Sequence, residues 1–193
     1  RLPELETKWI YYSSVAEDHG ELNDQIVKLV KEKNIKMGFN PGTFQLREGL
    51  ENLKGILEVT EVLILNKQEA EGLLNREEGA DVETLLKDLS DLGPSTVVIT
   101  DASRGSFSIS EGKFLKLGIL DVPVVERTGA GDAYSTGLIC ALISGKDISE
   151  AMKWGTINSS SVIQIIGAQS GLLKLEELEE LLLKNQNLVP EEF

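Results

Sequence analysis

The sequence contains only one cysteine and one histidine among its 193 residues. A single cysteine, Cys140, cannot form a disulfide within the chain, which fits a reducing compartment and favours a cytoplasmic protein. The single histidine, His19, has no evident partner in the sequence that would support acid–base chemistry, so we expect it in a surface loop. Metal sites and nucleophilic sites built on these two residue types are therefore not indicated.

Long apolar runs are missing and positive charge is scarce. No stretch approaches the roughly 20 apolar residues that a membrane span needs, and the opening residues do not resemble a secretory signal. The chain has 19 basic and 32 acidic residues, a formal net charge of −13. Because such an acidic surface repels phosphate backbones and anionic lipids, we expect neither nucleic-acid nor membrane partners. Backbone amides or a few basic side chains can still bind a small phosphate-bearing ligand.

What is present is an alternation of strand and helix patterns in a globular composition that is 41% hydrophobic. The length suits one α/β domain over 1–193 with a sizeable core. Strands are predicted at 9–15, 35–40, 61–66 and 95–100, with a hairpin over 106–117 that turns at Glu111-Gly112. Helices are predicted at 21–34, 47–60, 67–74, 81–92, 130–144, 147–165 and 175–185. This order favours a mostly parallel sheet with helices on both faces.

Ligands of such sheets bind beyond the carboxyl ends of the strands. The residues at these positions are Asn40, Asn66, Thr100, Asp101 and the loop at 127–132. We therefore expect a binding site among them. Asn66 has a second, local interpretation, because Asn66 and Glu69 have the spacing of a helix capping box. The two interpretations are compatible.

The stretch "RTGAGDAYSTG" at 127–137 is the most informative in the chain. Gly129, Ala130 and Gly131 precede a predicted helix, and small residues there let a ligand approach the backbone closely. The first amides of a helix lack intrahelical acceptors and lie at the positive end of its dipole, so they suit a transferred phosphoryl group. Asp132 next to them can accept a proton from an attacking hydroxyl.

Two other glycine-rich motifs fit this stretch less well, and an ordinary tight turn fits it equally well. The dinucleotide fingerprint G-x-G-x-x-G requires glycine where Tyr134 stands, which weakens an oxidoreductase hypothesis. A Walker A loop fails because Asp147 follows Gly145-Lys146 and Cys140 takes the place of its first glycine. Taken alone, G-A-G-D is as compatible with an ordinary tight turn, in which the helix dipole simply favours Asp132, as with a functional site.

The surrounding segments resemble the PfkB carbohydrate kinases, the ribokinase-like family. "ERTGAGDAYSTG" resembles that family's second signature, D-T-x-G-A-G-D-x-[FY]. In the family's order, "FNPGTFQL" resembles its strand-end element, "LILNKQEAEGLL" its N-x-x-E segment and "VVITDASRGSF" its T-x-G-x-x-G nucleotide loop. "INSSSVIQIIGAQSG" resembles the late helix and Gly-Ala turn that flank the adenine. The resemblance implies a ribokinase-like three-layer sandwich with a mostly parallel central sheet.

The resemblance also implies roles for individual residues. Asp132 matches the catalytic base, and Gly129, Ala130 and Gly131 match the anion hole. ATP and Mg²⁺ are implied as cofactors, with Glu69 acting on the metal largely through water. The remaining nucleotide-binding matches are Asn66, Thr100, Asp101, Gly105, Asn158, Gly167 and Ala168. The resemblance allows a monovalent cation such as K⁺, for which Glu126 and Thr128 are the matching positions.

The sequence also departs from the family pattern. Glu126 replaces the usual aspartate, which lengthens the arm of that carboxylate and puts the cation in question. Arg127 replaces a small polar residue, and we expect it to face solvent. Ala102 stands where the nucleotide loop usually has its first glycine, so we expect a reshaped turn. No segment matches the family's first signature, its Gly-Gly substrate segment or its β-lid, so the chain resembles the C-terminal, nucleotide-binding portion of such a kinase.

The resulting hypothesis is ATP-dependent phosphorylation of a hydroxyl on a small-molecule sugar or nucleoside. The alternative is a nucleotide-binding remnant of such a kinase without transferase activity, motivated by the unmatched N-terminal elements. Family members commonly pair through the lid, so a homodimer is allowed by the resemblance. The sequence names no particular acceptor.

Overall fold

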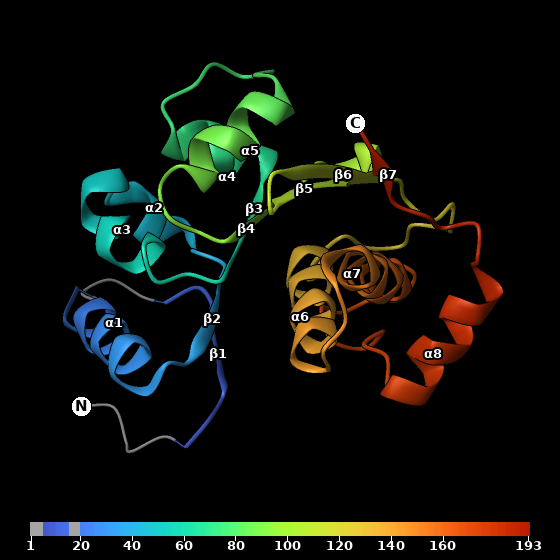
Figure 1. Cartoon of the computed structure of the whole chain (residues 1–193). Coiled ribbons are helices and arrows are strands. Elements are labelled where there is room, and N and C mark those ends of the chain that lie inside the picture. Colours follow the sequence, from blue (N-terminus) through green and yellow to red (C-terminus); the bar gives the residue numbers. More distant parts are fainter. Residues whose placement is uncertain (1–5, 16–19) are drawn as a thin grey trace. The chain divides into compact units, whose positions relative to one another are not determined.

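A computed structural model of the chain describes residues 6–15 and 20–193 (Figure 1). His19 lies outside the described residues, as do 1–5 and 16–18. The strands are β1 (Trp9–Tyr12), β2 (Lys36–Phe39), β3 (Val62–Asn66), β4 (Thr96–Thr100), β5 (Ser106–Ser110), β6 (Lys113–Leu117) and β7 (Glu191–Glu192). The helices are α1 (Gly20–Lys33), α2 (Thr43–Arg47), α3 (Leu50–Leu57), α4 (Lys67–Leu73), α5 (Val82–Ser90), α6 (Ala130–Ile143), α7 (Ile148–Val162) and α8 (Leu175–Lys184), with a 3-10 turn η1 (Ala102–Arg104).

The predicted elements are confirmed, with three additions. Helix α2 was not predicted, because the Pro41-Gly42 turn ahead of it suggested a loop; the Gly42 amide donates to Gln45 Oε1 at 2.7 Å and closes its first turn. The turn η1 and the two-residue strand β7 are too short to carry a periodic pattern. Strand β1 ends at Tyr12 and helix α7 at Val162, each three residues before the predicted end.

The strands pair in chain order, from β1 to β7, in one sheet. Strands β1 and β2 are parallel, with Trp9 opposite Lys36 and Tyr12 opposite Phe39, and β2 and β3 are parallel as well. Strands β6 and β7 are antiparallel. The expected α/β fold with a mostly parallel sheet is confirmed. Parallel pairing places the carboxyl ends of β1, β2 and β3 at the same edge.

The chain divides into two compact units, and the first extends to Ile99 and includes residues 108–113. In this unit β3 is buried from Val62 to Leu65 and β4 from Thr96 to Ile99, as expected for parallel strands covered on both faces. Helices α1 and α3 lie side by side (Figure 1). The largest fully buried apolar side chains on the helices of this core are Leu53, Ile56, Leu57, Leu85, Leu86 and Leu89.

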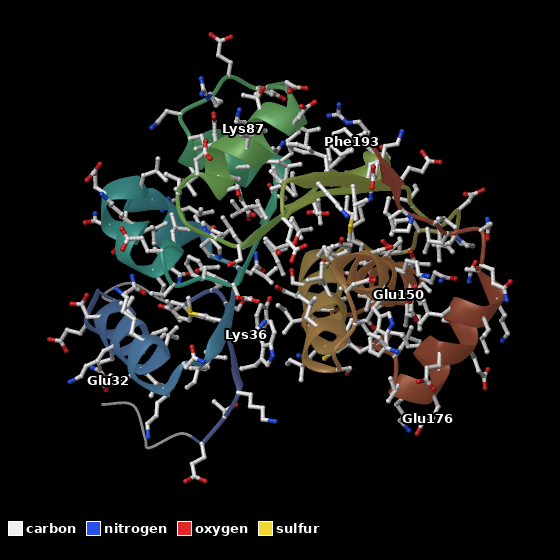
Figure 2. The ribbon with its side chains drawn as sticks, viewed as in Figure 1. Glu32, Lys36, Lys87, Glu150, Glu176 and Phe193 are labelled. Carbon is white, nitrogen blue, oxygen red and sulfur yellow. The ribbon has the colours of Figure 1, made fainter. Side chains whose placement is uncertain are left out.

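The second unit comprises residues 100–107 and 114–193. Helices α6 and α7 pack along each other, and α8 contacts α7 (Figure 1). Phe193 packs edge-on against Phe107 and Phe114, with ring centroids 5.6 and 5.9 Å apart, and lies beside β5 and β6 in Figure 2. The expectation of one domain over the whole chain stays a prediction.

The outer helix faces carry the charge that the composition indicated. Glu32 on α1, Lys87 on α5 and Glu176 on α8 are exposed and extend away from the ribbon (Figure 2). Over the described part of the chain, none of the helices combines the length and the apolar character required to cross a membrane.

Candidate functional site

The glycine-rich loop forms the N-terminus of α6, as the sequence predicted. Gly129 is the residue before the helix and has a φ of 82°, a left-handed conformation that favours glycine. The first i→i−4 bond runs from the Ala133 amide to the Gly129 carbonyl at 2.9 Å. The amides of Gly131 and Asp132 therefore have no intrahelical acceptor, which leaves them available to an anion at the positive end of the helix dipole.

Asp132 lies in the first turn of α6 and is exposed. A carboxylate in this position is accessible to a substrate hydroxyl while the dipole stabilises its charge. Gly131 beside it is also exposed, and a Cβ placed there would meet no atom within 4 Å. Arg127 and Thr128 are exposed as well, as expected for Arg127. The arrangement offers open backbone donors next to one acid.

The turn after α7 packs directly on this loop. A Cβ placed on Gly129 would come within 2.6 Å of the Ala168 carbonyl oxygen and 2.8 Å of its Cβ, so only glycine fits there. Gly167 has a φ of 104° and is half-buried. Ala168, which with Gly167 matches the adenine end by resemblance, therefore adjoins Gly129 of the predicted anion hole.

Glu126 connects the two segments through its side chain. Its Oε2 accepts a hydrogen bond from the Gly167 amide at 2.8 Å. This bond, and a second one from the Thr128 side chain, lower the pKa of the Glu126 carboxyl below its ordinary value. The backbone amides of Val125 and Glu126 both donate to the Ile163 carbonyl, at 2.8 and 3.2 Å. The start of the loop is thus held to the end of α7 by backbone and side-chain bonds.

Asn158 on α7 is buried, and both ends of its amide are used inside this unit. Its Nδ2 donates to the Ala133 carbonyl at 2.8 Å, and its Oδ1 accepts from the Leu173 amide at 3.1 Å. Its side chain is only 5% exposed, which decides against a wide contact with ligand. Asn158 therefore joins the first turn of α6 to the segment that follows the Gly167 turn.

The predicted nucleotide loop follows β4 and is reshaped, as the alanine at 102 suggested. Ala102 has a φ of 44°, which is strained for a residue with a side chain. The Asp101 amide donates to the Gly105 carbonyl at 2.8 Å, and the Arg104 guanidinium pairs with the Asp101 carboxylate at 2.9 Å. Gly105 has a φ of 86°, and a Cβ there would come within 2.0 Å of the Leu117 carbonyl oxygen. Thr100, the last residue of β4, is half-buried.

Asn66 and Glu69 belong to the other unit and form the capping box of α4. The Asn66 amide donates to Glu69 Oε2 at 2.8 Å, and the Glu69 amide donates to Asn66 Oδ1 at 2.9 Å. Nearby, Asn40 Nδ2 donates to the Ile64 carbonyl at 2.8 Å, so the ends of β2 and β3 are tied together. The interpretation of Asn66 and Glu69 as a capping box is confirmed, and one side-chain oxygen of each residue accepts a hydrogen bond in it.

Among the residues that the structure describes, no three His, Cys, Asp or Glu side chains gather closely enough to hold a metal ion. The resemblance implies that Glu69 acts on a divalent ion through water, an arrangement for which one carboxylate suffices. The residues present are compatible with Mg²⁺ in that form. A dedicated all-protein metal cage is not formed by the described residues.

The Glu126–Gly167 and Asn158–Leu173 hydrogen bonds were not anticipated from the sequence. The first joins residues 41 positions apart and the second joins residues 15 positions apart. The sequence marked Glu126 as the position that matches a monovalent-cation ligand and as a departure from the family's aspartate, but it gave no signal for a bond to Gly167 and none for Leu173. In the second unit the structure brings Glu126 and Gly129 together with Gly167 and Ala168, and Asn158 bonds to Ala133 at the start of α6.

Comparison with known proteins supports the family resemblance seen in the sequence. The sequence profile described as pfkB family carbohydrate kinase matches residues 10–175. A 5-dehydro-2-deoxygluconokinase from Halalkalibacterium halodurans is 27% identical over 168 residues, which cover 84% of this chain and 51% of that relative. The chain thus spans about half the length of this curated relative.

Solved structures show the same fold. The nucleoside kinase of Methanocaldococcus jannaschii, an archaeal member of the ribokinase family, superposes with a TM-score of 0.77 at 24% identity, covering 95% of this chain and 58% of that one. The ribokinase of Arabidopsis thaliana, solved with ribose and ATP, gives a TM-score of 0.77 at 22% identity, covering 91% and 55%. These similarities confirm the predicted ribokinase-like fold.

Proposed function

Because the chain belongs to the pfkB family of carbohydrate kinases, we propose that it contributes to ATP-dependent phosphorylation of a hydroxyl group on a sugar or nucleoside. The observation that carries this proposal is the N-terminus of α6, where open backbone amides adjoin the exposed carboxylate of Asp132. Phosphoryl transfer requires little covalent chemistry from a protein beyond positioning and charge stabilisation. An anion-binding helix terminus next to one acid meets that requirement.

In the proposed reaction Asp132 accepts the proton of the acceptor hydroxyl. The oxygen then bonds to the γ-phosphorus of ATP in line with the breaking bond, and ADP leaves with the electron pair of that bond. The amides of Gly131 and Asp132 stabilise the charge that spreads over the transferred oxygens. Gly129 permits this geometry through its left-handed φ, and Ala130 begins the helix that directs the amides.

For the nucleotide we propose that Thr100, Asp101 and Gly105 line one side of the binding region. Gly167 and Ala168 would lie at its adenine end, as the resemblance implies. For Asn158 we propose a supporting role, because both ends of its amide are already bonded within the protein. It would hold the Gly167 turn in position rather than contact the base widely.

For the metal we propose that Glu69 and Asn66 act on Mg²⁺ through water. When bound, Mg²⁺ would neutralise charge on the β- and γ-phosphates. The capping box fixes both side chains, since each accepts a hydrogen bond from the other's backbone amide. Carboxylate and amide oxygens fixed in this way can still accept hydrogen bonds from metal-bound water.

A second candidate function is nucleotide binding without transferase activity. The chain spans 51% of the 5-dehydro-2-deoxygluconokinase that it matches, and no segment of this sequence resembles the family's Gly-Gly substrate segment or its β-lid. A site that lacks the residues of these segments would bind ATP and leave the acceptor unbound. The two candidates share the nucleotide site and differ in turnover.

The experiment that separates them measures ADP release and ADP affinity side by side. The chain would be incubated with ATP and Mg²⁺ and a panel of sugars, sugar phosphates and nucleosides, together with Asp132→Asn. Loss of a general base lowers turnover by about 10²–10⁴-fold, so the kinase proposal expects acceptor-dependent release that Asp132→Asn loses while the ADP dissociation constant changes little.

Asp147→Asn serves as the matched control, because Asp147 caps α7 through the Glu150 amide at 2.9 Å and asparagine caps equally well. It should leave turnover unchanged. ADP binding without release on any acceptor would support the second candidate. Equal losses of turnover and ADP affinity in Asp132→Asn would instead assign Asp132 a structural role.

A further inference from the structure

We propose that Glu126 is a positioning residue whose carboxylate fastens the turn at 163–168 to the loop that carries Gly129, Ala130 and Gly131. The expected consequence for nucleotide affinity rests on the proposed function; the fastening itself does not. This role differs from the monovalent-cation role that the resemblance implies for Glu126 and Thr128.

The geometry that carries the proposal is a bridge between segments distant in sequence. Glu126 Oε2 lies 2.8 Å from the Gly167 nitrogen, a short bond between a charged acceptor and a backbone donor. Bonds of this kind are about twice as strong as those between neutral groups. Gly167 has a φ of 104°, so the turn uses a conformation that few residues adopt and that an external bond can hold.

The bridge acts where the turn touches the anion hole. Immediately beyond Gly167, Ala168 fills the space in which a Cβ of Gly129 would lie, with its own Cβ 2.8 Å from that position. A turn that moved away would leave Gly129 without this packing contact. Glu126 therefore controls how closely the proposed adenine end approaches the proposed phosphate end.

The length of the side chain decides between fastening and cation binding. The Glu126 backbone is held by the bond from its amide to the Ile163 carbonyl at 3.2 Å. Aspartate at this position would be shorter by one carbon–carbon bond, about 1.5 Å, so its carboxylate would fall outside hydrogen-bonding distance of Gly167. Glutamine would keep the reach and one acceptor and lose only the charge.

The test compares wild type with Glu126→Gln, Glu126→Asp and Glu126→Ala in buffers with and without K⁺. Amide hydrogen exchange of Gly167 and Ala130 would be measured by NMR, and ADP affinity by calorimetry. Loss of a charge-assisted bond should speed Gly167 exchange about tenfold or more in the Asp and Ala variants, with Gln in between. ADP affinity should fall in the same order, independently of K⁺.

Asp147→Ala is the matched control, because it also removes a carboxylate that accepts a backbone amide, the Glu150 amide, elsewhere in the same unit. It should leave Gly167 exchange at the wild-type rate, which separates local release from general destabilisation.

Three results would overturn the proposal. Gly167 exchange within twofold of wild type in Glu126→Ala would mean that the bond fastens nothing. If Gly167 exchange and ADP affinity in Glu126→Asp matched wild type, if those in Glu126→Gln matched Glu126→Ala, and if both variants responded to K⁺, Glu126 would be assigned to cation binding. If Gly167 exchange rates differed among the four proteins while their ADP affinities were equal, Glu126 would have no positioning role in nucleotide binding. If wild type binds no ADP, the proposed function fails, and the exchange order still decides the fastening.

Discussion

Gly137 on α6 lies against the backbone of Trp154 on α7, so closely that a Cβ on Gly137 would come within 2.9 Å of the Trp154 carbonyl oxygen. A Cβ on Gly155 would likewise come within 2.9 Å of the Tyr134 carbonyl oxygen. The two helices therefore cross with their backbones nearly in contact. Because α6 begins at the glycine-rich loop and α7 carries Asn158, this crossing sets the distance between two parts of the candidate site.

Substituting alanine at Gly137 or Gly155 should therefore destabilise the protein. Overpacking costs about 1–3 kcal/mol, and the better helix propensity of alanine returns only about 1 kcal/mol. We expect the free energy of unfolding, measured by urea titration, to fall in both variants. Gly55→Ala on α3 is the control, since a Cβ there meets no atom within 4 Å. Gly55→Ala should be neutral or stabilising; equal effects at all three positions would contradict a close crossing.

Gly129→Ala should damage the candidate site. The φ of 82° at Gly129 disfavours alanine, and the new methyl group would overlap Ala168. We expect ADP affinity, measured by calorimetry, to fall at least about tenfold, with local strain of about 1–3 kcal/mol. Gly131→Ala has open space around it, so its thermal stability should match that of wild type. A stable Gly129→Ala with unchanged affinity would show that the loop relaxes without cost.

Asn158→Ala should lower stability through two orphaned backbone groups. The Ala133 carbonyl and the Leu173 amide both bond the Asn158 side chain, and each unsatisfied group costs about 1–3 kcal/mol. Asn158→Asp keeps an acceptor for the Leu173 amide but places a carboxylate against the Ala133 carbonyl, so it should not restore the lost stability. Urea unfolding of both variants is the measurement. A neutral Asn158→Ala would mean that water replaces both bonds.

The Asp81 cap gives stability that depends on pH. The Thr84 amide and hydroxyl, each 2.9 Å from Asp81 Oδ2, lower the pKa of this carboxyl below its ordinary value. A lowered folded-state pKa means that the added stability is present above the unfolded-state pKa and is lost as the pH falls through the folded-state pKa. Asp81→Asn keeps a capping acceptor and cannot titrate. The difference in the free energy of unfolding between wild type and Asp81→Asn should be constant near pH 7. Below about pH 4 wild type should lose stability relative to Asp81→Asn. A difference that does not change with pH would exclude a contribution from Asp81 titration.

Much of the fold could be predicted because its signals are local. The buried runs at Val62–Leu65 and Thr96–Ile99 are continuous in the sequence, and helix periodicity marked α1 and α3. The capping box of Asn66 and Glu69 was predicted from a three-residue spacing and is confirmed at 2.8 and 2.9 Å. Helix α2 was missed because five residues give too few turns for a periodic signal.

The sequence by itself determined the α/β order, the start of α6 after a glycine-rich loop and the acid in its first turn, because each depends on residues within one or two turns of chain. Tertiary structure alone decided that Glu126 binds Gly167, that Ala168 covers Gly129 and that Asn158 joins Ala133 to Leu173. These contacts join segments whose separation in sequence leaves no periodic pattern. The close crossing of α6 and α7 depends in the same way on Gly137 and Gly155, whose role becomes visible only when the opposite backbone is in place.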